Sequence, residues 1–114
     1  MARRTPRLAV AITATAQREL IRIWDYNAEN RDVRQADAWD LFLRSKIDGL
    51  ATSYDKGKPV ENFPELKHVT VKKRPKAHGH IVVYEIDSAA NVVNILHVFH
   101  TSQDVQGRLK SEFE

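Results

Sequence analysis

The hydrophobic pattern is strongest between residues 80 and 104, where two runs of β-branched and aromatic residues flank a short polar stretch. The runs are Ile81–Ile86 and Val92–Phe99. Such side chains suit the covered, pleated surface of a sheet, and the Asp-Ser-Ala-Ala-Asn sequence between them is typical of a hairpin turn. The pattern predicts an antiparallel hairpin. Its second strand is apolar on both faces, so we expect it inside the sheet rather than at an edge.

Nearer the N-terminus, apolar residues first alternate with small ones and then recur at helical spacing, which predicts a strand followed by a helix. Leu8, Val10 and Ile12 alternate with small residues across 7–13, which indicates a strand. Thr13 or Thr15 is then a candidate N-cap. The predicted helix runs to about Asn27. Its apolar stripe is formed by Ala16, Leu20, Ile23 and Trp24.

A second helix is predicted to begin at Asp32, because Gln35 three residues later completes the pattern of a capping box. Its apolar residues follow near-heptad spacing, and Gly57 is a candidate stop with Pro59 just beyond. The stripe contains Ala36, Trp39, Phe42, Leu43, Ile47, Leu50 and Tyr54. Two amphipathic helices with a short connection favour an antiparallel helical hairpin.

The remaining pattern completes the predicted topology. Residues 58–64 are predicted as a loop, 66–71 as a short strand and 102–114 as a short terminal helix. Pro75 cannot donate a ladder hydrogen bond, so it marks a turn or a strand edge. The predicted fold is α+β in the order β-α-α-β-β-β, with the helical hairpin packed on a mainly antiparallel four-stranded sheet and a short C-terminal helix.

Composition narrows the class of protein without defining its function. A length of 114 residues, with 42% hydrophobic and 29% charged residues, is expected to form one soluble globular domain over 1–114. No apolar run has the length of a transmembrane helix, and no secretory signal pattern follows the basic N-terminus. The chain has no cysteine, which excludes disulfides and thiol catalysis and makes the cytoplasm the expected location.

The strongest chemical signal is a basic window. No acidic residue occurs from Leu66 to Tyr84, and the same window holds three histidines and five lysine or arginine residues. Such a cluster favours phosphate or an acidic partner, although a solvated turn explains it equally well. The basic residues of the turn are Lys72, Lys73, Arg74 and Lys76.

The histidines do not form a recognisable metal motif. His97 and His100 are three residues apart on a strand, so they project to opposite faces. The sequence has no HExxH motif and no carboxylate placed to complete a site. We expect no metal and no cofactor, and we interpret His97 as a hydrogen-bonded core or interface residue. A metal-independent nuclease remains an alternative, because lysine, arginine and histidine can polarise a phosphate and transfer protons. Its candidate residues are Lys73, Arg74, His80, Tyr84 and His100.

Three segments in this order resemble a known family. They are Ala16, Glu19, Leu20, Ile23 and Tyr26 in the first helix; Ala38, Leu43 and Ile47–Leu50 in the second; and Tyr84–Ile86, Val93–His100 and Asp104 at the end of the sheet. The chain resembles the ParE/RelE superfamily of small bacterial toxins from type II toxin–antitoxin pairs, and is most similar to its ParE branch. It differs from that branch at His97, where arginine is common, and at 101–103, which carry no arginine.

The resemblance implies a toxin that inhibits DNA gyrase and is neutralised by a cognate antitoxin. The alternative implied by the RelE branch is a ribosome-dependent mRNA endonuclease, and a third is an inactive relative that only binds its partner. The predicted antitoxin-binding residues are Trp24, Trp39 and Phe42. The predicted target-binding residues are Lys72, Lys73, Arg74, Lys76, His100 and Asp104.

Overall fold

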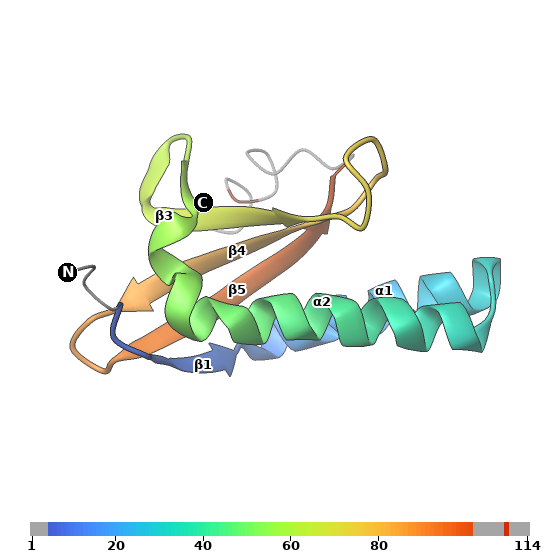
Figure 1. Ribbon diagram of the computed structural model, residues 1–114, viewed down its shortest axis with the longest axis horizontal. Helices are drawn as coiled ribbons and strands as arrows, with labels where there is room; N and C mark the ends of the chain where they lie inside the picture. Colours follow the sequence, from blue (N-terminus) through green and yellow to red (C-terminus); the bar gives the residue numbers. More distant parts are fainter. Residues whose placement is uncertain (1–4, 102–108, 110–114) are drawn as a thin grey trace.

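The predicted hairpin forms the centre of the computed structural model, which describes residues 5–101 and 109 (Figure 1). β4 (His80–Asp87) and β5 (Val92–His100) pair antiparallel. In the turn, the Asp87 carboxylate accepts the Ala90 N–H at 3.1 Å. Asn91 has φ 55°, a left-handed conformation that asparagine tolerates. The hairpin prediction is confirmed.

Five strands, rather than the four predicted, make the sheet. β1 (Ala9–Ile12), β2 (Lys58–Val60) and β3 (Phe63–Val71) join the hairpin in the order β1-β5-β4-β3-β2. β1 runs parallel to β5 and the other pairs are antiparallel, so the sheet is mixed. The α+β class is confirmed, and β5 is an internal strand as predicted.

β2 is the strand that the sequence analysis missed, because residues 58–64 were predicted to be a loop. Proline disfavours a strand in general because it has no N–H to donate. An edge strand such as β2 tolerates Pro59, since backbone positions that face outward from the sheet have no partner strand. Val60 is buried, and Asn62 makes the tight turn into β3 with φ 69°. The burial of Val60 holds this short edge strand on the sheet.

The helical hairpin consists of α1 (Ala14–Asn30) and α2 (Val33–Ser53), followed by the short 3-10 turn η1 (Tyr54–Lys56). The Thr13 hydroxyl accepts the Ala16 N–H at 3.2 Å and donates to the Ile95 carbonyl at 2.8 Å. Asp32 accepts the Gln35 N–H at 2.7 Å. Both caps were predicted, although the Gln35 side chain returns to the Asp32 side chain and not to its backbone.

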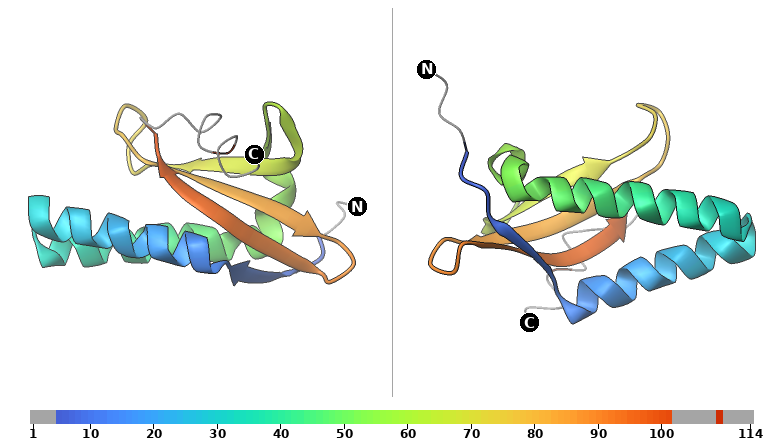
Figure 2. Two further views of the ribbon diagram at one scale, coloured as in Figure 1. Left: turned by 180° about the vertical axis from the view of Figure 1, so that it is seen from behind. Right: turned by 60° about the horizontal axis from the view of Figure 1, so that its bottom comes forward.

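The helices lie antiparallel across one face of the sheet (Figure 2). Within residues 5–101 and 109, no helix has both the length and the apolar composition that a membrane span requires. The main core lies between helices and sheet and contains Ala16, Leu20, Leu43, Ile47, Leu50, Val71, Val82, Tyr84, Val93, Ile95 and Val98. A smaller cluster on the opposite face contains Val60, Leu66, Val83, Phe99 and Leu109. The predicted helix over 102–114 lies outside the described residues except for Leu109.

A side chain closes the edge of β5 where β1 ends. β1 pairs with β5 only as far as Ile95. Beyond that point the Glu19 carboxylate of α1 accepts the Val98 N–H at 3.0 Å and faces His97 Nδ1 at 3.2 Å. An unpaired buried N–H would be destabilising, so Glu19 takes the place of a neighbouring strand. His97 is 5% exposed, and its predicted role as a hydrogen-bonded core residue is confirmed.

Candidate functional site

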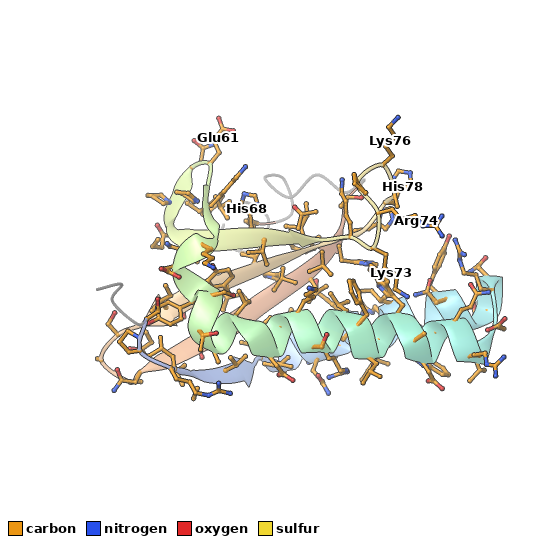
Figure 3. The ribbon with its side chains drawn as sticks, in the orientation of Figure 1. Glu61, His68, Lys73, Arg74, Lys76 and His78 are labelled. Atoms are coloured by element: carbon orange, nitrogen blue, oxygen red, sulfur yellow. The ribbon has the colours of Figure 1, made fainter. Side chains whose placement is uncertain are left out.

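The predicted target-binding cations lie on one exposed loop, residues 72–79, between β3 and β4 (Figure 3). Gly79 closes the loop, because any side chain there would overlap the Val71 carbonyl. The Thr101 N–H donates to the Gly79 carbonyl at 3.0 Å, and the Ala77 N–H donates to the Arg74 carbonyl at 3.1 Å. Backbone hydrogen bonds therefore shape the base and the tip of the loop.

The loop cations do not all point the same way. Lys73 is directed toward α2, whereas Lys76 points away from the fold (Figure 3). The Lys73 ammonium lies 5.5 Å from the ring centre of Phe42 and 5.8 Å from that of Trp39. Cation–π contacts at such distances are attractive. Lys73 thus connects the loop to α2.

His80 is bound into the protein beside this contact. Its Nδ1 accepts the Trp39 indole N–H at 3.1 Å, and the side chain is only 9% exposed. Burial, followed by the nearby His100, lowers the pKa of His80 to about 4. His80 is therefore neutral at pH 7, with its proton on Nε2.

His100 completes the cluster from β5. It is the strand partner of His80, and its ring meets that of His80 edge-on with centroids 5.4 Å apart. The ring centre of His78, on the loop, lies 5.5 Å from that of His100. Among the described residues, no group of three or more histidine, cysteine or acidic side chains is arranged to hold a metal ion.

Two of the predicted nuclease and target residues fall outside this cluster. Tyr84 is fully buried, and its hydroxyl donates to the Tyr54 carbonyl at 2.6 Å. Burial raises the pKa of Tyr84, opposed in part by the hydrogen bond from the Gly57 backbone. Gly57 is needed because a Cβ would overlap that hydroxyl, not because it ends the helix with a left-handed conformation. Asp104 lies outside the described residues.

The structure thus places Lys73 and His80 against Trp39, with His100 beside His80 and Arg74 next to Lys73 on the loop. A shallow depression beside them is lined by Thr70, Lys72, Lys73, Arg74 and Pro75. The arrangement presents fixed positive charge next to the neutral imidazole of His80. His68, from the same basic window, lies away from the loop in β3 (Figure 3).

The three predicted antitoxin-binding residues do not share one surface. Trp39 and Phe42 contact each other with ring centres 5.4 Å apart, under Lys73. Trp24 lies between the helices, where its indole N–H donates to Asp37 at 2.8 Å.

Two side-chain hydrogen bonds join the helices on their exposed side: Arg44 donates to Gln17 at 3.3 Å, and Trp24 donates to Asp37. On α1, Ile21 lies one turn after Gln17 and one turn before Trp24, so it is on the same face as both. On α2, Leu41 lies in the same way between Asp37 and Arg44. Ile21 is 51% and Leu41 73% exposed. This apolar pair, the Ile21–Leu41 seam, was missed because both residues lie off the buried stripes.

Glu19 is the other residue whose role the sequence analysis missed. It was noted only as part of the family resemblance, although it closes the β5 edge from another element. The available signal was an acidic residue next to the buried stripe of α1, one position before Leu20.

Comparisons with known proteins agree with this architecture. A family model described as the ParE toxin of the type II toxin–antitoxin system parDE matches residues 10–105. A search among curated proteins finds no match.

Solved structures with the same fold include toxins and toxin–antitoxin complexes. The chromosomal ParDE system from P. aeruginosa matches with TM-score 0.69 at 14% identity, covering 82% of this chain and 96% of that one. A mutant of E. coli toxin RelE in the free state matches with TM-score 0.59 at 14% identity, covering 93% of each chain. The toxin–antitoxin complex RelBE2 from Mycobacterium tuberculosis matches with TM-score 0.50 at 21% identity, covering 82% of this chain and 98% of that one. At these identities the likeness shows the fold.

Proposed function

The chain belongs to the ParE toxin family of type II toxin–antitoxin systems, and from that membership we propose that it inhibits DNA gyrase until a cognate antitoxin neutralises it. The family match over residues 10–105 carries the proposal. The basic loop and the His100 end of β5 form the face that meets the target.

The state of the candidate proton-transfer groups favours an inhibitor over a nuclease. A general base is most effective when its pKa lies near the working pH. The pKa of His80 is about 4, and its Nδ1 already accepts the Trp39 N–H. The Tyr84 hydroxyl is engaged with Tyr54 at the other end of β4. Both groups serve the fold in this arrangement.

A RelE-like mRNA endonuclease is the second candidate function. The observation that favours it is the meeting of Lys73, His80 and His100 beside Arg74, since cations and imidazoles are the groups that metal-free phosphoryl chemistry uses. The two candidates differ in how they respond to substitution. Substitution of a catalytic group lowers the rate by orders of magnitude, whereas substitution of an interface residue typically weakens binding by a few kcal/mol at most.

Two assays on the purified protein distinguish these functions. We expect supercoiling by gyrase to be blocked and ribosome-bound mRNA to stay intact. Lys73→Ala and Arg74→Ala should each weaken the inhibition gradually. Codon-positioned cuts in mRNA together with normal supercoiling would reject the gyrase function and favour Lys73, Arg74, His80 and His100 as catalytic residues.

The antitoxin is proposed to bind across the helical hairpin and the adjoining sheet, at Trp24, Trp39 and Phe42. A partly disordered antitoxin segment that folds on binding would cover apolar side chains of this kind. The exposed Ile21–Leu41 seam beside Trp24 supports this placement.

Leu41 offers a test of that placement with a matched control. Because Leu41 is 73% exposed, Leu41→Glu should leave the fold intact while it weakens antitoxin binding, measured by titration calorimetry. Leu41→Met keeps an apolar side chain and should bind as the unmodified protein does. Equal binding by both variants, with Trp fluorescence and helix amide exchange unchanged on mixing, would reject the placement.

A further inference from the structure

The basicity of this protein is concentrated in one loop. The chain has a net charge of +3, and Lys72, Lys73, Arg74 and Lys76 contribute +4, so all other residues together carry −1. The ion pairs found among residues 5–101 and 109 are Arg44–Asp40 and His97–Glu19. None of the four loop cations is neutralised by a carboxylate of the described chain.

The loop divides into an inner anchor and an outer charged face. Lys73 lies over the rings of Trp39 and Phe42, so its ammonium is directed inward. Lys76 is directed away from α2 (Figure 3), and Lys72 and Arg74 line the adjoining depression. All three are exposed. We define Lys72, Arg74 and Lys76 as the outer cations.

The loop is held in shape before any ligand arrives. At its base the Thr101 N–H donates to the Gly79 carbonyl at 3.0 Å, and the Gly79 N–H donates to the Thr101 hydroxyl at 3.3 Å. Lys73 adds the contact to α2. A pre-formed charged face loses less conformational freedom on binding than a flexible one does.

The composition of this face suits phosphate better than a protein surface. Protein interfaces place aromatic or apolar anchors at their centre and are depleted in lysine. The large exposed hydrophobic residues of the described chain are Ile21, Tyr26, Val33 and Leu41, all on the helices. A row of exposed cations without such an anchor is the pattern that neutralises a nucleic-acid backbone.

The aromatic residues near the loop also favour a duplex over a single strand. Proteins bind single strands by stacking unpaired bases on open aromatic faces. Here the Trp39 ring contacts Phe42, His80 and the Lys73 ammonium, and its N–H is used by His80. The loop's own exposed ring residue, His78, lies against His100, and the other polar side chains exposed on the loop are cations.

We propose that the outer cations bind backbone phosphates of duplex DNA, and that in the inhibited complex this duplex is the one held by gyrase. The second clause rests on the proposed function, whereas the first concerns the free protein. Lys73 is a positioning residue in this arrangement, since it holds the loop against α2.

The test measures binding of the full chain to a short, fluorescently labelled DNA duplex of mixed sequence as a function of salt. The variant Lys72→Ala/Arg74→Ala/Lys76→Ala removes the outer cations. The control Arg22→Ala/Arg34→Ala/Lys56→Ala removes the same charge from exposed positions on α1, α2 and η1. Circular dichroism confirms that both variants are folded.

Three phosphate contacts predict a difference of about 2.7 in the slope of log K against log salt, at about 0.9 per contact. Between about 50 and 200 mM salt, that slope makes the unmodified protein lose about 40-fold more affinity than the loop variant. The control should keep the slope of the unmodified protein. Equal slopes for the two triple variants would overturn the inference, because binding would then follow net charge alone.

Two further arms separate this inference from its rivals. If labelled polyglutamate binds through the outer cations and the DNA duplex does not, the loop docks an acidic protein segment and the inference is wrong. A supercoiling assay with gyrase runs in parallel. Gyrase inhibition without DNA binding overturns the inference and leaves the proposed function standing. Loop-dependent DNA binding without gyrase inhibition supports the first clause, that the free protein binds duplex DNA, and overturns both the second clause and the proposed function.

Discussion

Acidification should destabilise this protein through His80. The folded protein keeps His80 neutral, with Nδ1 accepting the Trp39 N–H and the ring 9% exposed. Its pKa in the folded state is about 4, against an ordinary value of 6.5. Because the folded pKa is the lower one, the unfolded chain takes up the proton first as the pH falls. The stabilisation is fully present above pH 6.5 and is lost as the pH falls toward 4.

The magnitude follows from proton linkage. With pKa values of 6.5 unfolded and about 4 folded, the free energy of unfolding drops by about 2 kcal/mol at pH 5 and by about 3 kcal/mol well below pH 4. His68 contributes in the same direction, because burial and then Lys58 lower its pKa. The comparison must therefore isolate His80 from the other groups that titrate.

His80→Asn isolates that contribution. The asparagine Oδ1 takes the place of Nδ1 as the acceptor for the Trp39 N–H, but it does not titrate. The free energy of unfolding is measured in urea at about pH 7.5 and about pH 5 for the variant and the unmodified protein. The unmodified protein should lose about 2 kcal/mol more than the variant between these conditions.

The control for this experiment is His78→Asn, the same substitution on an exposed loop histidine. It should leave the pH dependence as in the unmodified protein. If His80→Asn loses as much stability on acidification as the unmodified protein does, the burial of a neutral imidazole beside Trp39 is not the cause of the acid sensitivity.

Three further predictions concern stability and activity. Glu19→Ala should lower the free energy of unfolding in urea by about 2–4 kcal/mol, because a buried N–H and an imidazole both lose their partner. Glu19→Gln keeps one acceptor oxygen and should lose less than half as much; equal losses would contradict the edge-closing role. His97→Gln should lower the melting temperature and have a smaller effect on growth inhibition. A variant that is inactive but melts at the unchanged temperature would contradict this prediction. Gly57→Ala should cost about 1–3 kcal/mol, because the added methyl group overlaps the Tyr84 hydroxyl. The control Gly49→Ala has open space and should be neutral or stabilising by up to about 1 kcal/mol, so matching losses would argue against the overlap.

Features that depend on neighbours in sequence were predictable. The caps at Thr13 and Asp32 follow from side chains that reach an N–H three residues away. The β4–β5 hairpin follows from two β-branched runs with a polar turn, and the charge of the 72–76 loop is visible as a run of cations. The family resemblance rested on the order of segments in the two helices and the hairpin, and the match over residues 10–105 confirms it.

The candidate site was predictable only in part. Its residue types were identified, but their grouping was not, because the direction of a side chain depends on what packs beside it. Lys73 and Lys76 look equivalent in the sequence, yet only Lys73 meets the Trp39 and Phe42 rings. Tyr84 and His80 share a strand, yet the hydroxyl of Tyr84 is bound at the opposite end by Tyr54.

The two helices with their caps, the central hairpin and the basic loop could be predicted from local sequence, since each arises from local periodicity, local hydrogen bonding or a local run of charge. The parallel pairing of β1 with β5, the addition of β2 as a fifth strand and the closure of the β5 edge by Glu19 depend on long-range packing. These contacts join residues as far as 83 positions apart, as in the pairing of Ala9 with Val92. Each forms because a buried backbone group or apolar side chain needs a partner, and no periodicity along the chain records which distant residue will supply it.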